Sequence, residues 1–181
     1  MTKVQKVGIN DMKGFSKHQL YYVWAGILQR CFSKKFYIKQ PTYKGCTIDK
    51  SWLYFSSFYK WAIVQDWKGN AIDKDILKKG NKHYSPQTCI FVPAYLNNLL
   101  TDSASIRGSL PIGVKKHVRD NRYEAYVKIE GKKTYVGGHP TSEGAHKKYI
   151  LAKNAEILRI ASKQSNPTLI KALLKHRMKP C

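Results

Sequence analysis

Residues 122–161 read RYEAYVKIEGKKTYVGGHPTSEGAHKKYILAKNAEILRIA, and this stretch decides the fold class. Apolar and polar side chains alternate over 122–130 and again over 132–139, which is the period of a half-buried strand. Glu130-Gly131 stands between the two runs, where a tight hairpin turn is expected. Thr141 is placed to cap a long helix that follows. The stretch predicts two antiparallel strands packed on one helix.

The neighbouring sequence extends this unit in both directions. The segment IGVKKHV, residues 112–118, predicts a third strand, and Asp120-Asn121 predicts the turn after it. We expect one helix face to pack on the sheet, flanked by Ile157 and Ile160. That face consists of Ala145, Tyr149, Ala152, Ala155 and Leu158. Residues 101–111 are interpreted as a linker, and 163–181 as a basic tail with a short amphipathic helix after Pro167.

The N-terminal half has a helical pattern and then a mixed one. We expect a helix over 16–33 with Ser16 as its cap, a basic loop over 34–46, and a second helix over 51–65. Residues 69–100 predict the order strand, loop, strand, helix. The expected fold class is α+β, with domains at 1–104 and 105–162 and a tail at 163–181.

The charge points to a polyanionic partner. The chain has 33 Lys and Arg against 11 Asp and Glu, a formal net charge of +22. Residues 1–104, 105–162 and 163–181 carry +10, +7 and +5, so every segment is basic. Such a surplus is the electrostatic footprint of nucleic-acid binding. We expect double-stranded DNA, with RNA binding as a weaker alternative that no base-stacking motif supports.

Several other classes are not expected. The sequence has no apolar run long enough to span a membrane, and its first residues lack the apolar segment of a signal peptide. Cys31, Cys46, Cys89 and Cys181 form no Cys-x-x-Cys pair, so no zinc site is expected. Free thiols of this kind are typical of a reducing cytoplasm. The composition leaves the oligomeric state open.

The N-terminal unit resembles the HNH endonuclease superfamily, especially the homing-endonuclease-like proteins of phage genomes. The resemblance covers about residues 20–100, and its motifs include Ile72-Asp73-Lys74-Asp75, Gly80-Asn81, Tyr84-Ser85-Pro86, Cys89-Ile90-Phe91-Val92-Pro93 and Asn97. It implies a ββα-metal unit in which a divalent cation such as Mg²⁺ assists phosphodiester hydrolysis.

The resemblance also implies site residues. Asp73 takes the place of the metal carboxylate, and Asn97 that of the helix ligand. Lys74 stands where the family has its histidine base, and Thr88 stands at the middle asparagine position. His83, in the loop between the strands, is an alternative base. Asp73 and Asn97 also have an ordinary alternative role as turn and helix caps.

The C-terminal unit resembles the DNA-binding domain of the APETALA and ethylene-response-factor family. The resemblance lies in Gly113-Val114, Tyr123-Glu124-Ala125-Tyr126-Val127, Gly131-Lys132 and Tyr135-Val136-Gly137-Gly138. Phage homing-endonuclease-like proteins often carry this domain behind an HNH unit. It implies a sheet in the major groove, with Arg119 and Arg122 contacting bases and Lys115, Lys128 and Lys133 positioning the sheet on phosphates. His117, Tyr126 and Tyr135 are further candidates on the same strands.

These observations lead to two hypotheses. The first is a DNA-binding, homing-endonuclease-like protein that nicks or cleaves duplex DNA with a divalent metal, in the cytoplasm of an infected bacterium. The second is an inactive HNH-like protein that binds DNA or a host protein in an antidefence or regulatory role. The second hypothesis follows because the family's histidine and asparagine are absent: Lys74 and Thr88 stand at their positions.

Overall fold

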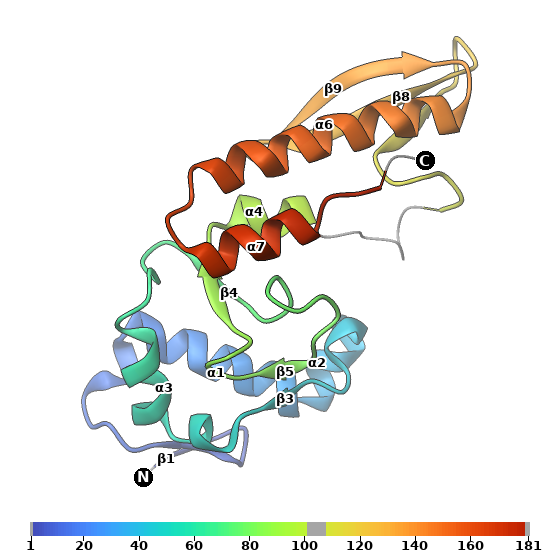
Figure 1. Cartoon of the computed structure of the whole chain (residues 1–181). Helices are drawn as coiled ribbons and strands as arrows, with labels where there is room; N and C mark the ends of the chain where they lie inside the picture. The colour runs from blue at the N-terminus through green and yellow to red at the C-terminus, as the bar shows by residue number, and fades with distance from the viewer. Residues whose placement is uncertain (1, 101–107, 180–181) are drawn as a thin grey trace. The chain divides into compact units, whose positions relative to one another are not determined.

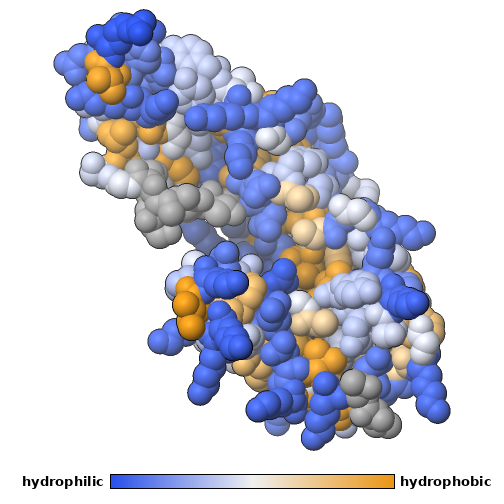
Figure 2. All heavy atoms as spheres, turned by 180° about the vertical axis from the view of Figure 1, so that it is seen from behind, coloured by the Kyte–Doolittle hydropathy of each residue, from blue (hydrophilic) through white to orange (hydrophobic). Residues whose placement is uncertain are grey.

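The computed structural model describes residues 2–100 and 108–179 (Figure 1). The chain is α+β, as expected, and its contacts divide it into two units, Met1–Pro93 and Ala94–Cys181. The sequence-based boundary at 104/105 lies outside the described residues. In these residues no helix has the length and apolar character needed to cross a membrane. Hydrophilic side chains cover much of the visible surface of both units (Figure 2).

The first unit begins with a hairpin that the sequence did not reveal, formed by β1 (Thr2–Val4) and β2 (Gly8–Asn10). The expected first helix is α1 (Gln19–Phe32). Its cap is His18 rather than Ser16, because the His18 Nδ1 accepts a hydrogen bond from the Leu20 N–H at 3.1 Å. Ser16 instead belongs to a short 3₁₀ turn, η1 (Phe15–Lys17).

The two segments that follow α1 depart from the sequence-based expectation. Residues 34–46 are partly helical, because Ser33 caps a further helix and Pro41 opens a 3₁₀ turn. The expected helix over 51–65 is split, since Tyr54 has an extended backbone. The elements are α2 (Lys34–Lys39), η2 (Pro41–Tyr43), η3 (Lys50–Leu53) and α3 (Phe55–Ala62).

The rest of the first unit contains four short strands. The predicted antiparallel pair is present as β4 (Ala71–Asp73) and β6 (Ile90–Val92), with α4 (Ala94–Leu100) next in the chain. This confirms the expected order of strand, loop, strand and helix. A second pair was missed, because β3 (Thr47–Ile48) and β5 (His83–Tyr84) are only two residues long and join distant segments in parallel.

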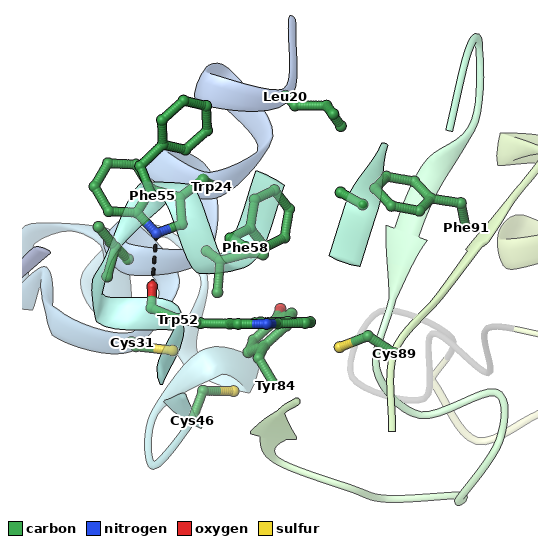
Figure 3. Close-up of a cluster of buried hydrophobic side chains, with 13 residues drawn as sticks. Leu20, Trp24, Cys31, Cys46, Trp52, Phe55, Phe58, Tyr84, Cys89 and Phe91 are labelled. Carbon is green, nitrogen blue, oxygen red and sulfur yellow. Dashed lines mark hydrogen bonds between the residues drawn. The ribbon is translucent and has the colours of Figure 1, made fainter. Parts of the chain in front are cut away.

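The core of the first unit is rich in aromatic side chains (Figure 3). Trp24 and Trp52 are fully buried, and the Trp24 indole N–H donates to the Trp52 carbonyl at 2.7 Å. Both α1 and α3 therefore present an apolar face to this core, at whose edge Val23 and Tyr59 are half-buried. Cys31, Cys46 and Cys89 are buried there as free thiols, and burial raises the pKa of Cys31 and Cys89 to about 12.

The second unit contains the predicted three-stranded antiparallel sheet in the order β7-β8-β9. The strands are β7 (Val114–His117), β8 (Arg122–Ile129) and β9 (Lys132–His139). Both expected turns are confirmed, and Asn121, Glu130 and Gly131 all have positive φ, as tight hairpins require. The helix α6 (Ser142–Ser162) packs along the sheet, and Thr141 caps it as predicted. The last helix, α7 (Pro167–Lys175), packs against α6.

The buried face of α6 differs from the predicted one. Ala155 and Leu158 are exposed, whereas Ile157 and Ile160 are buried. Two charged side chains, Lys153 and Glu156, belong to the buried face because each has a partner there. The predicted face is thus confirmed at Ala145 and Tyr149 and wrong at Ala155 and Leu158, because the apolar pattern does not reveal the two buried charges.

Candidate nucleic-acid interface

The C-terminal sheet has one face on α6 and one open face. Ala125 and Val127 of β8 are buried toward the helix, so the alternate residues of β8 point to the other side. The register places partners from β7 and β9 on that side as well. We call this surface the open face. It consists of Lys115, His117, Arg122, Glu124, Tyr126, Lys128, Lys133 and Tyr135.

Five of the six residues expected to contact DNA lie on the open face. The exception is Arg119, which lies in the turn between β7 and β8 and not on a strand. Its side chain is exposed at this turn beside Val118, which is 87% exposed. The expectation that Arg119 shares a strand face with Arg122 is therefore wrong, because β7 ends two residues earlier.

An aromatic cluster occupies the middle of the open face. The Tyr126 and Tyr135 rings meet edge to face with centroids 5.6 Å apart, and the Lys133 ammonium lies 4.4 Å from the Tyr126 ring centroid. The Tyr126 hydroxyl donates to Glu124 Oε2 at 2.8 Å, and this bond raises the pKa of Tyr126. Glu124 was not among the expected contacts, although its spacing of two from Arg122 places it on the same face.

Loose ion pairs surround Arg122 at the edge of the open face. Its Nε lies 3.8 Å from Asp120 Oδ2, and His117 Nδ1 lies 3.3 Å from the same oxygen. The side chains of Arg122 and Asp120 are each about half exposed. A surface pair of this kind contributes less than about 1 kcal/mol. Arg122 can therefore exchange Asp120 for another acceptor at little cost.

A charged network behind the sheet fixes the β8–β9 hairpin. Glu156 of α6 accepts hydrogen bonds from Arg159 at 2.7 and 2.8 Å and from the Glu130 backbone N–H at 3.1 Å. Arg159 also pairs with the Glu130 carboxylate at 3.0 Å. The Arg159 guanidinium holds the pKa of Glu156 below its usual range. The hairpin that carries Lys128 and Lys133 is thus bound to the helix from behind.

The expected metal carboxylate, Asp73, lies at the end of β4 in the first unit. It is 7% exposed, and its Oδ1 accepts the backbone N–H groups of Asp75 at 2.8 Å and Ile76 at 2.7 Å. Burial raises the pKa of Asp73, and the neighbouring Asp75 adds to this effect. Lys74 is bound in an ion pair with Asp75 at 3.2 Å.

The loop after β4 is tied to β5 by polar side chains. Asn81 Nδ2 donates to the carbonyls of Lys74 at 2.7 Å and His83 at 2.6 Å. Thr88, at the family's asparagine position, donates to the same His83 carbonyl at 2.7 Å. The His83 ring meets the Thr47 hydroxyl at 2.9 Å across β3 and β5. Asn81 thus links the backbone at Lys74, next to Asp73, to the backbone at His83. The sequence did not indicate this linking role of Asn81.

The second expected metal ligand, Asn97, lies on α4 and belongs to the second unit. Metal binding by Asp73 and Asn97 remains a prediction, because the two residues fall in separate units. Residues 2–100 and 108–179 contain no cluster of three or more His, Cys, Asp or Glu suited to a metal ion. Comparison of the chain with protein families, curated proteins and solved structures finds no match.

Proposed function

We propose that the protein binds double-stranded DNA by placing the open face of its C-terminal sheet in the major groove. One observation carries this proposal: Lys115, Arg122, Lys128 and Lys133 gather on the face that α6 leaves uncovered. The major groove is about 12 Å wide and admits a β-ribbon. Lysines on the face suit phosphate contacts, and an arginine on it suits a guanine edge.

The salt dependence of binding tests this proposal. Three phosphate contacts by Lys115, Lys128 and Lys133 give a slope of log K against log salt of about −2.7. Changing Lys128 and Lys133 to Gln should reduce that slope by about 2 and weaken binding to every duplex alike. The control changes Lys147 and Lys163, which are exposed outside the sheet, to Gln. If both double variants lose the same slope, the open face is not the interface.

This proposed function has two possible forms. In the first form, the protein is homing-endonuclease-like and also nicks or cleaves duplex DNA. The antiparallel β4–β6 pair, with Asp73 at the end of its first strand, supports this form. Mg²⁺ binds through one or two carboxylates together with water and substrate phosphates, so the neighbouring carboxylates of Asp73 and Asp75 suit such an ion. When bound, the ion would supply charge stabilisation at the scissile phosphate.

The second form is a DNA-binding or host-interaction protein without hydrolytic activity, acting in an antidefence or regulatory role. The contacts of the Asp73 segment favour it, since Asp73 Oδ1 holds two backbone amides and Lys74 is ion-paired. For a phage-encoded protein, both forms would act in the cytoplasm of the infected bacterium.

A supercoiled-plasmid assay separates the two forms. The purified chain is incubated with Mg²⁺, with Mn²⁺ or with EDTA, beside Asp73→Ala and Asn97→Ala. Metal-dependent nicking that both substitutions abolish establishes the nuclease. A gel shift without nicking in either metal establishes the binder.

A further inference from the structure

One acidic side chain stands in the middle of the basic open face. Glu124 lies on the central strand, between Arg122 and Tyr126 along β8. A carboxylate on a surface that meets phosphates weakens binding, because like charges repel. We therefore expect Glu124 to contribute something other than the strength of binding to DNA.

The Tyr126 hydroxyl orients this carboxylate. It donates to Glu124 Oε2 at 2.8 Å. Among the described residues it is the only hydrogen-bond donor to Glu124, and no described cation forms an ion pair with it. Oε1 is thus left as an acceptor, held in position by the bond to its partner oxygen. Glu124 is half-buried, and among the described residues only Trp52 and His117 have a buried side-chain polar atom without a partner, so Oε1 is in reach of solvent.

Polar groups of neighbouring residues lie beside Glu124 on the open face. The cross-strand partner of Glu124 on β9 is Gly138, which has no side chain. A Cβ on Gly138 would lie 3.1 Å from the Tyr135 hydroxyl and 3.8 Å from Arg122 Nε. The Tyr135 hydroxyl and Arg122 Nε thus lie over the Gly138 backbone, next to the cross-strand position of Glu124. Donors and an acceptor meet at one place on the face.

We propose that Glu124 accepts a hydrogen bond from the N4 amino group of a cytosine, making a G·C pair a fixed part of the DNA site. In the major groove, cytosine presents an amino donor and guanine presents two acceptors. Arg122 suits the guanine acceptors and Glu124 suits the cytosine donor. The two residues stand two apart on one strand, about 6.6 Å, so their side chains reach base pairs that lie close together in the groove. This inference rests on the proposed binding of duplex DNA by the open face.

The test is a selection of bound duplexes from a random pool, followed by affinity measurements on the selected site and on its single-base variants. It uses the full-length chain, Glu124→Ala, Glu124→Gln and Gly138→Val. Glu143→Gln is the matched control, because it removes one exposed acid of α6 away from the open face. Far-UV circular dichroism checks that each variant is folded.

The wild-type protein should select a site with an invariant cytosine, and replacing that cytosine should weaken binding about 5- to 10-fold. Glu124→Ala should lose this preference and bind unrelated duplexes more tightly, because a negative charge is gone. Glu124→Gln should shift the preference to adenine, whose N6 and N7 suit an amide. Gly138→Val should displace the Tyr135 hydroxyl and Arg122 from their places beside Glu124 and lose the preference, whereas Glu143→Gln should keep it.

The outcomes separate this inference from the proposed function. A chain that binds duplex DNA with no base preference, or Glu124→Ala with an unchanged preference, overturns the role of Glu124 and leaves DNA binding in place. If the unchanged chain binds no duplex at all, the proposed function fails, and the inference fails with it.

Discussion

Replacing Glu156 with Ala should unlock the β8–β9 hairpin from α6. The substitution removes an acceptor that is 4% exposed and holds two hydrogen bonds from Arg159 and one from the Glu130 N–H. Hydrogen bonds to a charged group contribute about 1.5–3 kcal/mol each when buried. Arg159 is one-third exposed and keeps its pair with Glu130, so water and that pair recover part of the loss. We expect a net cost of about 2 kcal/mol.

Hydrogen exchange read by mass spectrometry is the suitable measurement, because it reports on each unit separately. A cost of about 2 kcal/mol makes the amides of residues 122–139 exchange roughly 30-fold faster where exchange requires the unit to open. Peptides from the first unit, which contains Trp24 and Trp52, serve as the internal reference. Glu143→Ala removes an exposed acid from the same helix and should change little. Wild-type protection of 122–139 in Glu156→Ala would refute the anchoring role of Glu156.

Three further predictions follow from the contacts described above. The destabilisation caused by Glu156→Ala should become smaller as the pH falls through the lowered pKa of Glu156, because the charged carboxylate contributes its stability only while it is ionised. Urea unfolding of both proteins at pH 7 and at pH 3 measures this difference in the free energy of unfolding. Gly113→Ala should lower the free energy of unfolding by about 2 kcal/mol more than Gly108→Ala. Both glycines have a positive φ, but only a Cβ at position 113 would lie 2.1 Å from the Tyr149 ring. Thermal unfolding of the two variants side by side measures the difference. Asp73→Asn should have an unfolding temperature no lower than that of the wild-type protein, because the amide oxygen still accepts hydrogen bonds from Asp75 and Ile76 and no charge is buried. Asp73→Ala removes this acceptor and should lower the unfolding temperature. If Mg²⁺ binds at Asp73, adding Mg²⁺ should raise the unfolding temperature of the wild-type protein only.

The second unit could be predicted closely because its signals are local. Alternation, Asp120-Asn121 and Glu130-Gly131 fixed the strand limits to within about two residues, and the backbone angles at Asn121 and Glu130 explain why. The buried face of α6 was shifted because Lys153 and Glu156 lie on it, and partnered charges do not appear in a hydrophobic pattern. Arg119 was misplaced for a related reason, since the strand ends before the charged run does.

The first unit was harder to predict because its details depend on distant contacts. The β3–β5 pair joins residues far apart in the chain and is too short to have a period. Residues 34–46 contain breakers, yet Ser33 and Pro41 begin helical turns there. The polar contacts of the Asp73 segment, with Asn81 and Thr88 holding the His83 carbonyl, depend on the folded loop, so no spacing rule could reveal them.

The described acids of the second unit are distributed unevenly among its cations. Asp120 lies beside Arg122 and His117, and Glu156 and Glu130 hold Arg159. No described acid pairs with Lys115, Lys128 or Lys133 on the open face. Arg122 and Arg159 are thus partly used within the protein, while these three lysines keep their charge for a partner. On the proposed function, the lysines set the strength and salt dependence of binding, because phosphate contacts carry no sequence information. On the same proposal, sequence preference comes from the residues that reach base edges, and we assign that role to Arg122 and Glu124 on β8.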